Sequence, residues 1–198
     1  MSQLVGLEKT YLLRMRFGVT SASFDLEQPV EIVGGEDHLT PEAVRAAIES
    51  LPGTHSQMPP IFSAIKQKGR PVYLRARLGK EVTMTARDIL VHEAEVVSIA
   101  LPEVTFRVRV SKGTYIRSLV RDLAESLGTA GLLVDLVREG IGHWRYEDAL
   151  TLTEAVSLLS LPGADLSVAT PEDPSTPQFS LRSNRSAQDD PVRTWITD

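Results

Sequence analysis

The 198-residue chain contains no cysteine. It therefore has no disulfide bond, no thiolate nucleophile and no sulfur ligand for a metal ion. Its few histidines are scattered and lack the paired spacing typical of metal ligands: His38, His55, His92 and His143. The sequence accordingly predicts that the protein holds no metal ion.

Long apolar runs are missing as well. The chain has no stretch of about 18 consecutive apolar residues, which is the signature of a membrane-spanning helix. Its first residues, MSQLVGLEKT, contain neither the basic segment nor the apolar segment of a secretory signal. We therefore expect no membrane partner and a cytoplasmic location. A length of 198 residues, 42% of them hydrophobic, is sufficient for one domain with its own core.

The chain has no overall surplus of basic residues, since 21 lysines and arginines stand against 26 acids and the formal net charge is −5. The acids are unevenly placed, however. From residue 146 onward there are nine acids and three arginines, whereas the preceding part holds 18 basic and 17 acidic residues. The acidic average therefore describes the C-terminal part and not the rest.

Two segments are basic and nearly free of acids. Residues 64–87 hold seven basic residues and one acid, and residues 105–121 hold five basic residues and no acid. A single segment of this kind is typical of the solvated face of a helix or strand. Two of them in an otherwise acidic chain favour a polyanionic partner.

Periodic patterns predict an α+β fold with a mostly antiparallel or mixed sheet and flanking helices. Alternating apolar residues and an apolar run predict strands over residues 10–19, 87–101, 104–110 and 132–137, the second and third as a hairpin across Pro102. Helical spacing and capping residues predict helices over residues 40–51, 71–78, 116–127 and 151–162. Residues 163–198 are rich in Ser, Thr, Pro and Asp without a sustained period, which predicts an acidic, disordered tail after a domain at residues 1–162.

The first cluster that could carry chemistry is the run QMPPIFSAIK at residues 57–66. Its two prolines restrict the backbone to an extended path, so Ser63 and Lys66 lie on a stiff loop. A stiff loop can position a partner. The same run is also typical of a purely structural crossing, and the residues alone leave both interpretations open.

The second cluster is the run VSKGTYIRSL at residues 110–119. Gly113 permits a sharp turn, and the helix that follows offers free amide groups at its start, where an anion can bind. At this junction Tyr115 can stack on a planar base while Arg117 holds a carboxylate. Alternatively, Tyr115 packs in the core and Arg117 caps a neighbouring carbonyl group.

The third cluster is the run LVGLEKTY at residues 4–11, which leads into the first predicted strand and ends at an aromatic residue. In this order and with these spacings, the three clusters resemble the bacterial tRNA pseudouridine synthase B family. The similarity covers roughly residues 4–156, and its most specific parts are GLEKTY, QxPPxFSAxK and SKGTYIR.

The resemblance implies a reaction and a substrate. Members of the family convert a uridine in the TΨC loop of tRNA, at position 55, to pseudouridine, and they use no cofactor. The target base is flipped out of its stack, which requires aromatic stacking partners, while basic residues hold the phosphates. We therefore expect the TΨC stem-loop of tRNA as the partner of a monomeric protein.

The resemblance also implies roles for individual residues. Tyr11 matches the tyrosine that stacks on the target base, and Tyr115 matches a second pocket tyrosine, a candidate for proton transfer. Arg117 corresponds to the arginine that pairs with the catalytic aspartate, and Leu136 to an apolar residue that lines the nucleoside pocket. Three basic residues are expected to contact the RNA backbone: Lys66, Arg75 and Arg77.

One feature of the family has no match. The nucleophilic aspartate of the family lies in a Gly-Thr-Leu-Asp-Pro loop, and none of the aspartates of this chain stands in such a motif. We therefore expect residues 1–162 to be a partial catalytic domain that is inactive alone and marginally stable because of open strand edges. We also expect Arg117 to lack its carboxylate partner.

Three hypotheses follow from these patterns. In the first, the chain is part of a tRNA uridine-55 pseudouridine synthase whose aspartate is supplied by a preceding segment. In the second, it is a catalytically inert paralogue that binds tRNA. In the third, it is an unrelated small α+β enzyme that uses Arg117 and a carboxylate such as Asp122 on a small anionic metabolite.

Overall fold

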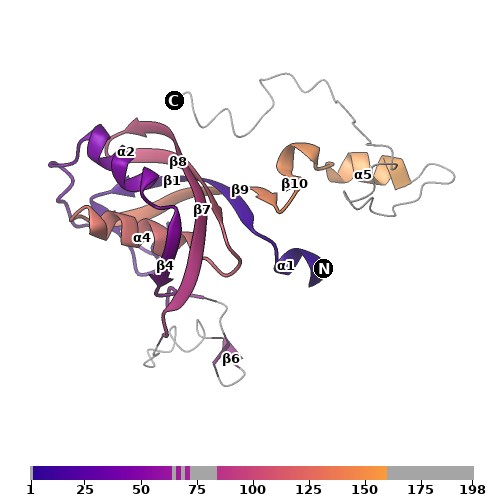
Figure 1. Cartoon of the computed structure of the whole chain (residues 1–198), viewed down its shortest axis with the longest axis horizontal. Coiled ribbons are helices and arrows are strands. Elements are labelled where there is room, and N and C mark those ends of the chain that lie inside the picture. The colour runs from indigo at the N-terminus through magenta and orange to yellow at the C-terminus, as the bar shows by residue number, and fades with distance from the viewer. Residues whose placement is uncertain (1, 64–65, 68–69, 72–83, 160–198) are drawn as a thin grey trace.

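The computed structural model describes residues 2–63, 66–67, 70–71 and 84–159. Within these ranges six strands form one antiparallel sheet in the order β10-β9-β1-β8-β7-β4 (Figure 1). Their bounds are Lys9–Phe17 (β1), Gly53–Gln57 (β4), Arg87–Ala100 (β7), Glu103–Val110 (β8), Gly131–Ile141 (β9) and Trp144–Arg145 (β10). The predicted α+β fold with a mostly antiparallel sheet is confirmed.

The remaining elements are short strands and helices. Two strand pairs lie outside the main sheet, β2 (Val19–Thr20) with β3 (Glu31–Ile32) and β5 (Lys66–Gln67) with β6 (Arg70–Pro71). The helices are α1 (Ser2–Val5), α2 (Pro41–Glu49), α4 (Ile116–Ser126) and α5 (Leu152–Leu159), and a 3₁₀ turn covers Tyr146–Asp148. No helix in the described ranges is both long and apolar enough to cross a bilayer.

The central strand β1 follows the predicted alternation. Leu13, Met15 and Phe17 are buried in the hydrophobic core, and Tyr11 packs against the edge of that core. Strand β8 alternates in the same way and pairs with β1 over its whole length. Because side chains of a strand point alternately to opposite faces, these two strands define an apolar face and a polar face of the sheet.

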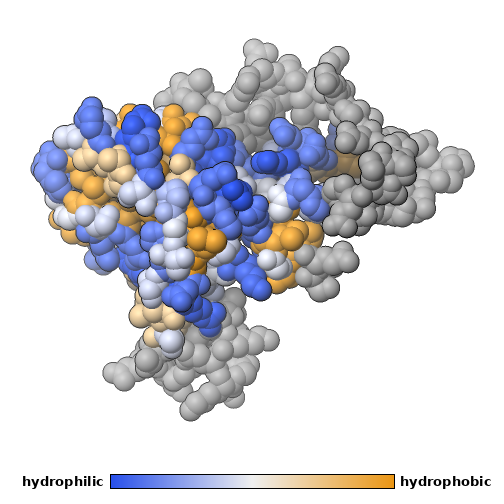
Figure 2. Space-filling model, in the orientation of Figure 1, coloured by the Kyte–Doolittle hydropathy of each residue, from blue (hydrophilic) through white to orange (hydrophobic). Residues whose placement is uncertain are grey.

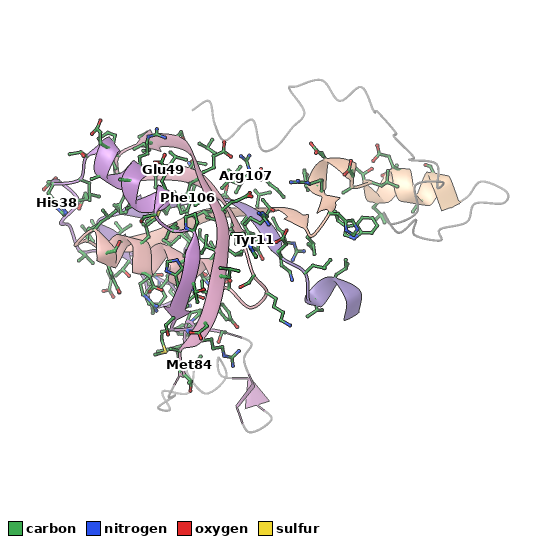
Figure 3. The ribbon with its side chains drawn as sticks, in the orientation of Figure 1. Tyr11, His38, Glu49, Met84, Phe106 and Arg107 are labelled. Atoms are coloured by element: carbon green, nitrogen blue, oxygen red, sulfur yellow. The ribbon has the colours of Figure 1, made fainter. Side chains whose placement is uncertain are left out.

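Helices α2 and α4 cover the apolar face. In Figure 1 both lie to the left of the sheet, whereas α1 and α5 lie to the right. Val44 and Ile48 of α2 and Val120 of α4 are fully buried in the same core as Phe106 of β8. Figure 3 labels Phe106 on the side of these helices and its neighbour Arg107 on the other side.

Two helix starts agree with the capping residues in the sequence. The Thr40 hydroxyl accepts a hydrogen bond from the Ala43 amide at 3.2 Å, and Pro41 occupies the first helical position of α2. At α5 the Thr151 amide donates to the Glu154 carboxylate at 2.7 Å, and the Glu154 amide donates to the Thr151 hydroxyl at 3.3 Å. This reciprocal pair is the predicted capping box.

Other expectations differ from the structure. The strand expected to be buried over 132–137 extends from 131 to 141, and its Leu136 is 40% exposed because the helical layer does not cover the whole strand. The helix expected over 71–78 lies almost entirely outside the described residues, and Pro71 belongs to β6. The acidic tail at 163–198 also lies outside them, so that expectation stays a prediction.

Candidate functional site

Helix α4 and strand β9 run in opposite directions against each other, and this determines which side chains meet. A Cβ atom added to Gly131, the first residue of β9, would lie 2.5 Å from the Cβ of Ala124 near the end of α4. The end of the helix therefore covers the beginning of the strand. Its beginning is linked to β9 through Arg117, because Arg117 binds Asp25 and the backbone of Asp25 bridges to Leu133 of β9.

The register of β1 brings Tyr11 to the same region. Leu13 pairs with Leu136, and Tyr11 pairs with Arg138 on β9 and with the core residue Val108 on β8. Tyr11 and Leu136 are thus diagonal neighbours on adjacent strands and share the helix-covered face. The register thus places the two predicted pocket residues near each other on this face, where Leu136 is exposed and Tyr11 is half-buried.

Tyr115 is held by a side chain from a distant strand. It is the N-cap of α4, but its own side chain makes no capping hydrogen bond. The amide of Gln57, at the end of β4, donates from Nε2 to the Tyr115 carbonyl at 3.1 Å, and its Oε1 accepts from the Tyr115 amide at 2.9 Å. Gln57 is only 2% exposed. The side-chain amide thus acts like a neighbouring strand and satisfies both backbone groups of Tyr115.

Arg117 has a carboxylate partner, so the expectation that it lacks one is wrong. Its Nη1 donates to Asp25 Oδ2 at 2.9 Å and to the Ser23 carbonyl at 3.2 Å, and its Nη2 donates to the Phe62 carbonyl at 2.9 Å. The side chains of Arg117 and Asp25 are 21% and 17% exposed. One guanidinium therefore joins α4 to two loops that are far away in the sequence.

Asp25 is itself held in place. The hydroxyl of Ser23 donates to its carboxylate, the hydroxyl of Ser21 donates to its carbonyl at 2.6 Å, and its backbone bridges to Leu133 on β9. Ser21 and Ser23 are both buried. The loop after β2 is therefore fixed against β9 beside the start of α4, and its carboxylate points at Arg117.

Positive charge gathers around the first residue of β1. The Lys9 ammonium donates to the carbonyls of Val5 at 2.9 Å and Leu7 at 2.7 Å. Partial burial lowers the pKa of Lys9, and the nearby positive charges of Arg138 and Lys112 lower it further. Arg138 and Lys112 thus each lie near Lys9, at the end of β1 where the strand begins.

The opposite face of the sheet is also rich in charge, but there the charges are paired. Arg107 binds Glu139 at 2.6 Å and Glu95 at 2.8 Å, and Arg109 binds Glu8 at 2.8 Å as well as Glu93. We call these side chains the outer-face ladder. The hydrogen bond with Glu139 raises the pKa of Arg107, and the hydrogen bond from Arg109 lowers the pKa of Glu93. Figure 2 shows hydrophilic residues over much of the face that β7 crosses.

The outer-face ladder changes the interpretation of the basic segment at 105–121. Two of its five basic residues are neutralised by acids from β7, β9 and the loop before β1. Arg117 and Arg121 are paired as well, Arg121 with Asp122, which is the carboxylate named in the small-enzyme hypothesis. Among the five, Lys112 is exposed at the turn before α4.

A cavity of about 380 Å³ lies near the C-terminal end of α4. Its walls include Phe24, Arg121 and Gly128, and the Arg121 guanidinium lies 5.1 Å from the centre of the Phe24 ring. Neither Tyr11 nor Tyr115 lines it. No group of three or more histidine and acidic side chains that could hold a metal ion occurs in the part of the chain that the structure describes.

Comparison with known proteins agrees with the sequence motifs. The model of the TruB family pseudouridylate synthase N-terminal domain matches residues 1–116. The chain belongs to this family. It is 39% identical over 144 residues to the tRNA pseudouridine synthase B of Phocaeicola vulgatus, covering 73% of this chain and 61% of the relative. It is 41% identical over 150 residues to that of Burkholderia mallei, covering 75% of this chain and 49% of the relative. The chain thus spans about half to three fifths of the length of these relatives.

Solved structures share the fold at lower identity. A crystal structure of a Cbf5-Nop10-Gar1 complex aligns with a TM-score of 0.56 and 23% identity, covering 80% of this chain and 38% of that one. A structure of an H/ACA RNP bound to a substrate RNA aligns with a TM-score of 0.52 and 21% identity, covering 80% of this chain and 36% of that one. These similarities show that the fold of this chain is shared with those structures.

The structure describes little of the three basic residues that were expected to contact the RNA backbone. The backbone of Lys66 forms β5, whereas Arg75 and Arg77 lie outside the described residues. Sequence reasoning in turn missed two residues of the site, Gln57 and Asp25. Gln57 belongs to a family motif that could have pointed to it, whereas nothing in the sequence around Asp25 indicates that its partner is Arg117, 92 residues away.

Proposed function

We propose that the protein to which this chain belongs isomerises uridine to pseudouridine at position 55 in the TΨC loop of tRNA, without a cofactor. In this reaction the bond from the ribose C1′ to N1 of the base breaks, and a bond from C1′ to C5 forms. The C5 proton leaves and N1 gains a proton, so nothing is added to or lost from the substrate overall. Family membership supports the reaction class.

The observation that supports the proposal is the neighbouring position of Tyr11 and Leu136 on adjacent strands of the helix-covered face, together with the ion pair that holds Arg117 to the Asp25 loop against β9. An extruded pyrimidine needs an aromatic surface, an apolar wall and a fixed polar group. In the proposed complex Tyr11 stacks on the base, Leu136 lines the pocket and Tyr115 transfers a proton. Basic residues hold the phosphates: Lys112, Arg138 and, on the expectation from sequence, Lys66, Arg75 and Arg77.

The nucleophilic aspartate motif of the family has no match in this sequence. Because none of its aspartates stands in a Gly-Thr-Leu-Asp-Pro motif, we propose that residues 1–162 form a partial catalytic domain that binds RNA but is inactive alone. Asp25 holds Arg117 in its place at 2.9 Å. We further propose that the protein acts as a monomer in the cytoplasm and that residues 163–198 form a disordered acidic tail.

The ion pair between Arg117 and Asp25 also fits a second function, that of an inert tRNA-binding paralogue. Because Asp25 already neutralises Arg117, the chain can form a fixed pocket without a catalytic aspartate, as an inert tRNA-binding paralogue would. Two assays on unmodified tRNA distinguish the two functions: a gel shift for binding and an assay for pseudouridine. The 198-residue chain should bind without forming product under both functions.

A fusion protein that supplies the catalytic aspartate distinguishes the two functions. A fusion in which the aspartate-bearing N-terminal segment of a relative precedes the chain should form pseudouridine at position 55 if the chain is the remainder of a synthase. Tight binding of tRNA by the fusion without any product would support the inert paralogue. A chain that binds no tRNA would exclude both functions.

The structure also predicts which face binds RNA. Replacing Lys112 and Arg138 with glutamine should weaken binding of the unmodified TΨC stem-loop about tenfold and reduce its salt dependence, because up to two phosphate contacts are lost. The matched control is Arg107→Gln with Glu139→Gln, which removes a pair of the outer-face ladder without changing the net charge. Filter binding at several salt concentrations should show wild-type affinity for this control, and a weaker control would place RNA on the outer face.

A further inference from the structure

We propose that Gln57 is a positioning residue that sets the place of Tyr115 against the extruded base. This inference rests on the proposed function and deepens it, because it assigns the geometry of the pocket to a side chain on an edge strand of the sheet. Gln57 is the last residue of β4, and 58 positions separate it from Tyr115. The two hydrogen bonds between them are called the Gln57 clamp.

The first step of the argument is that the Gln57 clamp acts on one residue only. Both ends of the side-chain amide bind the backbone of Tyr115, as donor to its carbonyl and as acceptor from its amide. Two bonds from a planar group to one residue define both the position and the orientation of that residue. A side chain that served only to fill space would need neither bond.

The second step is that the neighbouring hydrogen bonds to the loop at 58–62 bind residues after Tyr115, whereas Gln57 binds Tyr115 itself. The hydroxyl of Ser118 donates to the Met58 carbonyl at 2.8 Å, and Arg117 donates to the Phe62 carbonyl. These bonds attach the first turn of α4 to the loop at 58–62, but they act after Tyr115 in the sequence. The Tyr115 carbonyl also accepts from the Leu119 amide at 3.0 Å, so a displaced clamp would move the first helical hydrogen bond as well.

The third step is burial. Gln57 is 2% exposed, and its side-chain amide carries a donor and an acceptor on two separate atoms, so it can bind both the carbonyl and the amide of Tyr115 without burying a charge. A carboxylate at this position would still accept from the Tyr115 amide. Its second oxygen would face the Tyr115 carbonyl and repel it until a proton was added.

The test uses the base-dependent part of RNA affinity, which needs no catalysis. The unmodified TΨC stem-loop is compared with the same RNA that carries an abasic site at position 55. The Kd of the abasic RNA divided by the Kd of the uridine RNA, called the Kd ratio, reports how well the pocket holds the base. In Gln57→Glu this ratio should fall about tenfold at about pH 9 and return toward the wild-type ratio at about pH 5, because the protonated acid can donate again. Gln57→Met keeps the size without the hydrogen bonds and should show the loss at every pH.

Two controls separate positioning from a general loss of structure. Gln28→Glu makes the same substitution at a half-buried loop position and should leave the ratio and its pH profile unchanged. Hydrogen exchange of the Tyr115 amide should become faster in Gln57→Met than in the wild type, while the thermal transition stays cooperative.

The outcomes are decisive in both directions. Faster exchange at Tyr115 with an unchanged Kd ratio in both Gln57 variants would overturn the inference and leave the proposed function intact. A wild-type chain that binds both RNAs with the same Kd has no base pocket, which refutes the proposed function together with the inference. A ratio that falls in Gln57→Glu without recovering at low pH would attribute the effect to packing and would also overturn it.

Discussion

Replacing Arg117 with alanine should lower the free energy of unfolding by about 2–3 kcal/mol. The substitution removes three hydrogen bonds that join α4 to the loops at Ser23–Asp25 and at Phe62. It also leaves the Asp25 carboxylate, which is 17% exposed, without its cation. The expected loss is below that of a fully buried pair because water reaches both side chains and screens the charges. Urea denaturation followed by circular dichroism measures it.

The control for Arg117 is an arginine whose ion pair is exposed. Arg45 lies 3.9 Å from Glu49, and their side chains are 53% and 58% exposed, so Arg45→Ala should change stability by less than about 0.5 kcal/mol. Arg117→Lys keeps the charge but lacks the planar guanidinium that reaches several acceptors, and it should lie between the two. An Arg117→Ala chain as stable as the wild type would mean that the three contacts do not hold these loops.

The same arginine should matter for RNA. If Arg117 fixes the start of α4, Arg117→Ala should reduce the difference in Kd between the uridine and abasic stem-loops more than Arg117→Lys does. An Arg45→Ala chain should keep the full difference in Kd between the two stem-loops, because Arg45 lies on α2 and pairs with Glu49 of the same helix.

A side chain at Gly131 should separate α4 from the sheet. The added Cβ in Gly131→Ala would lie 2.5 Å from the Cβ of Ala124 and 3.4 Å from the Val120 carbonyl, and neither atom belongs to a flexible side-chain end. Helix and strand must move apart, at a cost of about 2–3 kcal/mol for overpacking. Because α4 carries Tyr115 and Arg117, the base-dependent part of RNA affinity should fall with the stability.

The Gly131 prediction has a matched control and a rescue. Nothing lies within 4 Å of the Cβ position of Gly6, so Gly6→Ala should leave stability unchanged within about 0.5 kcal/mol. Ala124→Gly removes the clashing methyl group, and the double variant Gly131→Ala, Ala124→Gly should be more stable than the sum of the single effects by at least about 1 kcal/mol. Additive effects would show that the contact between these two residues is not the cause.

Local patterns predicted the elements that hold the site. The alternation of Tyr11, Leu13, Met15 and Phe17 identified β1, and Thr40 with Pro41 identified the start of α2. These predictions succeeded because strand alternation and helix capping depend on residues that are close in the sequence. The helix at 116–127 was identified in the same way, and the structure ends it at Ser126.

The charge patterns were less informative. The basic residues at 105–121 were counted without the acids that face them across strands, namely Glu8, Glu93, Glu95 and Glu139. Those partners lie up to 101 residues away. Arg117 was expected to be unpaired for the same reason, since Asp25 is 92 residues away.

By itself, then, the sequence determined the fold class and the family, and it supplied the prediction of which residues line the pocket. It could do so because periodicity, capping and short motifs are written in consecutive positions. Only the tertiary structure decided which acids pair with Arg107 and Arg109, which carboxylate holds Arg117 and which side chain binds the backbone of Tyr115. Each of those depends on a hydrogen bond between segments that strand register and helix packing bring together, and a distance in space of about 3 Å leaves no local trace in the chain.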